Sequence, residues 1–203
     1  KACILLKSVG NDSPLKLQKS YTGHASIDEI AQLSIREITG EAPISYSFRS
    51  YYGNDETVFE APGFEVPTVT LTRFPFLEYH TDQDTPERLS IAALNEVYDV
   101  VMHIINVIET NLKGDCVQPG LYCLSHPDYD LYCNAPEPGI SQKGNSQTEK
   151  SWNLLMNCLS RELGDGASLS QLCKKYQIMY ETLHKYICLW ESKGLVTLKR
   201  SEL

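Results

Sequence analysis

The stretch Val66-Pro67-Thr68-Val69-Thr70-Leu71-Thr72-Arg73-Phe74-Pro75-Phe76-Leu77-Glu78-Tyr79-His80-Thr81-Asp82-Gln83-Asp84-Thr85 joins a β-type run to a turn rich in carboxylates. Its first part, Val66 to Leu71, has the β-branched composition of a strand. Loops at strand ends commonly carry functional groups. The imidazole of His80 and the nearby carboxylates could therefore converge on a cation.

Strand-like and helix-like segments alternate in the first half of the chain. Ala2 to Val9 has the pattern of a central, buried strand, and Leu15 to Tyr21 alternates like a more exposed one. A helix is expected from Ser26, as its cap, to Ile38, and another from about Glu87 to Glu109. Strands interleaved with helices predict an α/β fold.

Two motifs in this region resemble a known family. Tyr79 to Thr85 matches the Tyr-His-Thr-x-x-Asp-Thr segment that carries the final metal ligand in the aminopeptidase-like zinc exopeptidases, the clan of bacterial leucyl aminopeptidases. Asn54-Asp55, Phe59, Gly63 and Pro67 follow an order similar to an upstream pattern of that clan. The chain looks most like the aminopeptidase-like proteins of bacterial surface-polysaccharide and natural-product clusters, which end in a winged helix. The resemblance implies a partial three-layer α/β/α zinc-exopeptidase-like core followed by a small winged helix-turn-helix domain.

The resemblance also implies roles for four residues. His80 would be a metal ligand, and the hydroxyl of Tyr79 would contact the tetrahedral oxygen of the reacting group. Asp55 and Glu56 would line the substrate pocket, where one of them would bind the substrate's amine. Each residue has a structural alternative: His80 as a hydrogen-bonded loop histidine, Tyr79 as an aromatic packed on the next helix, and the Asp55-Glu56 pair as a solvated turn.

The resemblance covers only the last part of the clan's core. The clan's first ligands lie upstream of such a region, and this sequence opens at Lys1 without them. We therefore expect a fragment or one half of a split enzyme, completed by upstream residues or a companion chain. Where the clan has a ligating Asp near a strand end, this chain has Lys7, with Asp12 as a displaced candidate. The implied cofactor is one or two zinc ions. A lysine at the position of a ligating Asp disfavours binding of the second ion.

The implied function is zinc-dependent hydrolysis of N-terminal peptide or amide bonds in a peptide or aminoacyl-type substrate. A non-catalytic interaction or scaffold subunit, a pseudo-peptidase with a winged-helix partner-binding domain, is the alternative. A DNA-binding regulator is a third reading. Metal content separates the first reading from the others, and salt-dependent DNA binding would identify the third.

Charge disfavours a nucleic-acid partner. The net charge is −8, and only residues 150–203 are basic, with eight Lys and Arg against five Asp and Glu. A nucleic-acid surface is usually strongly basic. The expected helices near residues 148–163, 168–176 and 180–192, followed by a β-type run, have winged helix-turn-helix order. We expect this domain to contact proteins, with homo-oligomerisation through it as one possibility.

Three segments are predicted: residues 1–112 as the α/β core, 113–148 as a Pro- and Gly-rich connector, and 149–203 as the winged helix-turn-helix domain. The connector contains Cys116, Cys123, His126 and Cys133, which either bind zinc or are ordinary reduced loop residues. Seven cysteines without a disulfide framework favour a reducing compartment, so a cytoplasmic location is expected. No uninterrupted apolar run of membrane-spanning length and no signal peptide is visible.

Overall fold

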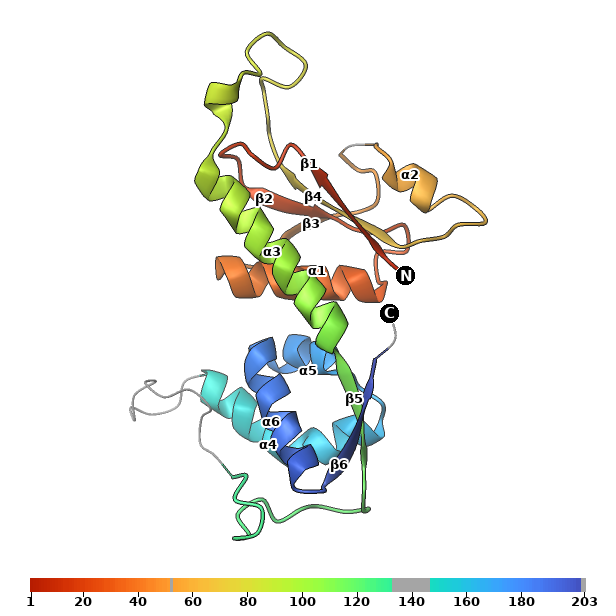
Figure 1. The fold of residues 1–203 in the computed structure, drawn as a ribbon, viewed down its shortest axis with the longest axis vertical. Helices are drawn as coiled ribbons and strands as arrows, with labels where there is room; N and C mark the ends of the chain where they lie inside the picture. Colours follow the sequence, from red (N-terminus) through yellow and green to blue (C-terminus); the bar gives the residue numbers. More distant parts are fainter. Residues whose placement is uncertain (52, 133–146, 202–203) are drawn as a thin grey trace. The chain divides into compact units, whose positions relative to one another are not determined.

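The structure, a computed structural model, describes residues 1–51, 53–132 and 147–201 (Figure 1). The chain forms two compact units, Lys1–Glu109 and Thr110–Glu202. The first has a mixed four-stranded sheet with helices, and the second has a two-stranded sheet with helices. The α/β class predicted from the sequence is confirmed.

The sheet of the first unit has the order β1 (Cys3–Lys7), β4 (Thr68–Arg73), β2 (Leu15–Gln18) and β3 (Ile44–Tyr46). Strands β1 and β4 are parallel, β2 is antiparallel to β4, and β3 is parallel to β2. The expected strand over Val66 to Leu71 is thus present two residues further along the chain.

The expected positions of the first two strands were wrong. β1 lies at the sheet edge with Leu6 50% exposed, whereas Leu17 of β2 is fully buried. The alternation of Lys16 and Gln18 with leucines suggested an exposed strand. Gln18 is instead 3% exposed, and its Oε1 accepts the backbone N–H of Tyr51 at 3.4 Å, while Lys16 is half-buried. An alternating pattern shows that the two faces of a strand differ chemically. It does not show which face is exposed to solvent.

Helices α1 (Ser26–Thr39) and α3 (Ile91–Thr110) belong to this unit, together with the one-turn α2 (Glu56–Phe59) and the 3₁₀ turn η1 (Pro86–Arg88). The guanidinium of Arg73 projects from β4 on the same face as Val69 and Leu71 and reaches Glu96 of α3, so α3 covers that face. The structure thus shows helices over one face, and the third layer of the predicted core is not shown.

Two helix starts differ from the sequence prediction. Ala25, not Ser26, is the cap of α1, and the Asp28 carboxylate accepts the Ala25 N–H at 2.9 Å. The helix expected from Glu87 begins only at Ile91, because the chain first makes η1 and then a backbone bond from Ser90 to Gly10 at 2.7 Å.

Helix α3 is long and apolar enough to cross a membrane, by length and composition alone, and it is the one such helix among the described residues. Core helices share that property. Val100, Ile104 and Val107 on α3 are completely buried, whereas only 28% of its apolar 18-residue window is buried in the protein.

The second unit pairs β5 (Leu112–Cys116) with β6 (Val196–Arg200) antiparallel, and holds α4 (Gln147–Gly164), α5 (Leu169–Tyr176) and α6 (Tyr180–Ser192). Its core includes the indoles of Trp152 and Trp190, each 1% exposed. Strand β5 occupies the start of the stretch that was expected to be a connector. Its Lys-Gly-Asp centre has no strand pattern, and its partner strand β6 lies 80 to 88 residues further along the chain, from the pairs Cys116–Val196 and Leu112–Arg200. The six cysteines in the described ranges are free thiols, and Cys133 lies outside those ranges.

The fold predicts a contrast between neighbouring isoleucines of α3. Ile104 is fully buried and Ile105 is 42% exposed. We expect Ile104→Ala to lower the free energy of unfolding by about 2–5 kcal/mol through lost burial and a residual cavity. Ile105→Ala, the matched control, should cost less than about 1 kcal/mol. Urea titration followed by far-UV circular dichroism measures both, and equal effects would contradict this placement of the helix.

A second prediction concerns pH and the second unit. Glu162 Oε1 accepts hydrogen bonds from Lys175 Nζ at 2.5 Å and from the Tyr176 hydroxyl at 2.7 Å. The bond from Lys175 is the main reason why the pKa of Glu162 is lowered in the folded protein. A lowered folded-state pKa stabilises the protein above the unfolded-state pKa of about 4.3, and this is lost as pH falls through the folded-state value.

Glu162→Gln should therefore be less stable than wild type by about 1 kcal/mol at pH 7, and the difference should shrink as the pH falls below the unfolded-state pKa and through the lowered folded-state pKa. Fluorescence of Trp152 and Trp190 reports unfolding of this unit, which contains both tryptophans. Glu181→Gln is the control, since the Glu181 side chain is 77% exposed and its pair with Lys185 is solvated. A constant difference across this pH range would contradict the assignment.

Candidate functional site

The parallel pair β1 and β4 places two loops at one edge of the sheet. Lys7 pairs with Thr72, so both strands end at the same side. Residues 8–14 follow β1, and residues 74–90 follow β4. In open α/β sheets, ligands bind outside the carboxyl ends of the strands. This edge is therefore the candidate site.

Asn11 joins the two loops. Its amide nitrogen donates to the carbonyl of Ser8 at 2.7 Å and to that of Arg73 at 3.2 Å. Its side-chain oxygen accepts the N–H of Ser13 at 2.9 Å. The Ser13 hydroxyl in turn donates to the carbonyl of Pro75. The turn after β1 is thereby fixed to the end of β4.

The side chain of Arg73 also fixes the turn after β1 to the end of β4. Its guanidinium donates to the carbonyl of Ser13 at 2.8 Å, to that of Ala93 at 3.3 Å and to Glu96 Oε1 at 2.7 Å. Its side chain is only 7% exposed. One buried cation therefore connects β4, the turn after β1 and helix α3.

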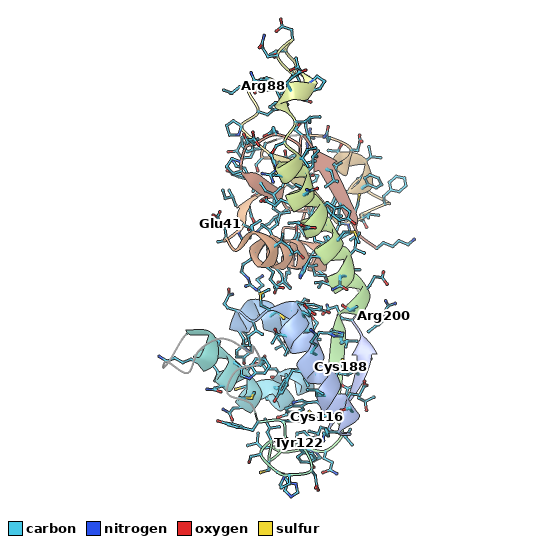
Figure 2. The ribbon with its side chains drawn as sticks, turned by 60° about the vertical axis from the view of Figure 1, so that its left-hand side comes forward. Glu41, Arg88, Cys116, Tyr122, Cys188 and Arg200 are labelled. Carbon is cyan, nitrogen blue, oxygen red and sulfur yellow. The ribbon has the colours of Figure 1, made fainter. Side chains whose placement is uncertain are left out.

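A cavity of about 690 Å³ opens between the two loops, and its wall includes Asn11, Asp12, Phe76, Glu78, Glu87 and Arg88. A smaller cavity of about 180 Å³ shares Asn11, Phe76 and Arg88 and extends to Tyr79. Arg88, labelled in Figure 2, lies 3.6 Å from Glu78 Oε1. A hydrogen bond from the Thr85 side chain lowers the pKa of Glu87. Carboxylates thus outnumber the guanidinium in the wall of the larger cavity.

Tyr79 and His80 form the aromatic part of the site. Their rings stack with centroids 3.9 Å apart, and Lys7 Nζ lies 5.2 Å from the Tyr79 ring centroid. His80 is exposed and has φ of 62°, a left-handed conformation that is uncommon for a residue with a side chain. Residues in such conformations cluster at active sites and ligand clamps.

Asp55 and Glu56 lie in a different segment, at the start of α2, before the amino end of β4. Asp55 is exposed, whereas Glu56 is 1% exposed. Glu56 Oε1 accepts the N–H of Asn54 at 2.8 Å, and Glu56 Oε2 is buried without a partner among the described residues. The carboxylate of Glu60, one turn later, accepts the N–H of Thr68 at 2.7 Å. The four predicted residues therefore come from two segments, and only Tyr79 and His80 stand in direct ring contact.

The described ranges bring too few metal-ligating side chains together for a metal site. No three His, Cys, Asp or Glu side chains within residues 1–51, 53–132 and 147–201 gather to hold a metal ion. His80 alone cannot make a zinc site, which takes three or four protein ligands. The sequence also offered a zinc site formed by Cys116, Cys123, His126 and Cys133. Cys133 lies outside the described ranges, so the structure describes only three of these four residues.

Sequence reasoning did not find Asn11 and Arg73. A signal for Arg73 was present, because it continues the positions of Val69 and Leu71 on the apolar side of β4. A cation at such a position is expected to be buried and paired. Asn11 gave no comparable signal, since an Asn between Gly10 and Asp12 reads as an ordinary turn residue.

Comparison with known proteins places the first unit in a family. The family model described as "Domain of unknown function (DUF4910)" matches residues 1–111, and the chain belongs to this family. No curated protein matches the chain.

A crystal structure of a protein from Clostridium acetobutylicum, provisionally named a peptidase, is similar over 97% of this chain, with a TM-score of 0.70 and 21% identity. The chain spans 41% of the length of that protein. The fold is therefore peptidase-like.

The site geometry predicts that Asn11 controls the order of the turn after β1. Asn11→Ala should remove the acceptor for the Ser13 amide and cost about 1–3 kcal/mol, because buried partners are left unpaired. Hydrogen exchange measured by NMR should show faster exchange of the Ser13 amide. Asp12→Ala, a change at the exposed neighbour, should leave that rate unchanged. Unchanged exchange in Asn11→Ala would contradict the role given to this side chain.

Proposed function

We propose that this chain is part of a zinc-dependent, aminopeptidase-like hydrolase that acts on N-terminal peptide or amide bonds. The observation that carries the proposal is the contact of Tyr79 with His80 in the loop after β4, at the carboxyl edge of a parallel strand pair. The peptidase-like fold and the adjoining cavity support it.

In this proposal His80 is one zinc ligand. Its exposed imidazole is accessible to a metal and to ligands from another polypeptide. The remaining ligands come from residues beyond this sequence or from a companion chain, in keeping with the greater length of the similar protein. Zinc bound there would supply a Lewis acid and lower the pKa of a bound water.

The other residues have the roles implied by their environments. The Tyr79 hydroxyl is a hydrogen-bond donor for an oxygen that gains negative charge during hydrolysis. Glu56 is the stronger candidate for the substrate's amine, since its Oε2 is a buried acceptor that has no partner among the described residues. Asp55, exposed beside it, would add negative potential that attracts a cationic group.

A second candidate function, a non-catalytic scaffold subunit, is favoured by the second unit. We propose that the helices and the β5–β6 pair form a winged helix used for protein contacts. Three of its lysines are ion-paired: Lys175 with Glu162, Lys185 with Glu181 and Lys199 with Asp115. Such pairing disfavours phosphate binding. Leu154 and Leu189, each more than half exposed, suit a protein partner.

Free thiols support a reducing, cytoplasmic setting.

Zinc content tests the catalytic proposal. The chain purified from its native context, with any companion polypeptide, should contain stoichiometric zinc by elemental analysis. His80→Ala should lower zinc affinity at least about 10-fold, because one ligand is lost. His24→Ala is the control, since His24 is an exposed histidine whose Nδ1 lies 2.7 Å from the Thr22 carbonyl oxygen. Zinc retained in His80→Ala would exclude His80 as ligand, and a metal-free, inactive complex would favour the scaffold function.

A further inference from the structure

The strand register places two lysines on either side of one threonine. Thr72 of β4 is paired with Lys7 of β1 and with Lys16 of β2. Laterally paired residues project from the same face of a sheet. All three side chains therefore share the face opposite the one that α3 covers. Because neighbouring strands are about 4.8 Å apart, the two lysine backbones are separated by about 10 Å. Two long lysine side chains can converge on one small group across that span.

Aromatic rings hold both ammonium groups. Lys16 Nζ lies 3.8 Å from the ring centroid of Phe74, and 5.7 and 5.9 Å from those of Tyr46 and Tyr51. Lys7 Nζ lies over Tyr79. Rings attract a cation through their quadrupole without cancelling its charge. Within the described ranges, Lys16 has no carboxylate partner, so its positive charge remains available to a ligand.

The threonine between the lysines has an unmet hydrogen-bonding group. Thr72 is 3% exposed, and its Oγ1 has no partner in the described part of the chain. A buried polar group left unpaired costs about 1–3 kcal/mol, and it calls for an explanation such as a bound ligand. A hydroxyl can donate to an anion that the ammonium groups also bind.

We propose that Lys7, Lys16 and Thr72 bind a carboxylate of the substrate, beside Tyr79. In the larger cavity, the carboxylates Asp12, Glu78 and Glu87 outnumber the guanidinium of Arg88, so the wall of that cavity repels such a group. The ligand class is therefore a short peptide with a free carboxylate, such as a dipeptide. This inference rests on the proposed function for the identity of the substrate as a peptide, and it does not depend on zinc.

Binding without catalysis tests the inference. Isothermal titration with alanyl-alanine and with its C-terminal amide, both in EDTA, compares ligands that differ in the carboxylate. The acid should bind at least about 10-fold more tightly than the amide, as expected for charge-assisted hydrogen bonds. Lys16→Met, which keeps an apolar stem near Phe74, and the near-isosteric Thr72→Val should each reduce this preference.

Lys19→Met is the matched control, because it removes the same charge one residue after β2 without touching the three-residue site. Circular dichroism verifies that each variant is folded, and Lys16→Arg should keep the preference as a second check. Equal binding of acid and amide, no binding of either, or an unchanged preference in Lys16→Met would overturn the inference and leave the lysines as structural cation–π partners. Because EDTA removes zinc, a failure of the catalytic proposal would appear only in the zinc measurement.

Discussion

The buried guanidinium of Arg73 organises the first unit. It lies on the apolar side of β4 and meets a backbone carbonyl of the turn after β1, another carbonyl in α3 and the carboxylate of Glu96. The guanidinium is buried, whereas the Glu96 carboxylate is 39% exposed, so the two backbone carbonyls are the partners that satisfy the cation inside the unit. The turn after β1, strand β4 and helix α3 are therefore held together. The candidate site lies at the carboxyl ends of β1 and β4.

The two faces of the same sheet serve different purposes. On one face, Val69 and Leu71 pack in the apolar core. On the other, Thr70 and Thr72 keep buried hydroxyls without partners among the described residues, and Glu56 in the preceding segment keeps a buried unpaired carboxylate oxygen. Buried polar groups without partners are uncommon in folded proteins and often mark functional positions. Of these groups, Thr72 lies near the carboxyl end of β4, where the Tyr79 loop begins, and its open hydroxyl is consistent with a site completed by a ligand or by further polypeptide.

The second unit is held by contacts between distant parts of its sequence. The Asn111 side chain bonds to the backbone N–H of Ser170 and to its hydroxyl, and the Tyr186 hydroxyl donates to the carbonyl of Leu131. The Tyr122 hydroxyl donates to the carbonyl of Leu195, and its ring meets Trp190 edge to face. Part of the stretch that appeared to be a connector is therefore built into this unit.

The sequence by itself determined the α/β class, the strand before the Tyr79-His80 turn and the extent of most helices, because these follow from local periodicity, capping and turn chemistry. The sequence also predicted that Tyr79 and His80 lie together, because they are consecutive residues. Only the tertiary structure decided that β1 is an edge strand, that residues 112–116 form β5, and that Lys7 and Lys16 flank Thr72. These depend on pairing between segments far apart in sequence, and such pairing is set by the register and packing of the whole sheet, which no local pattern encodes.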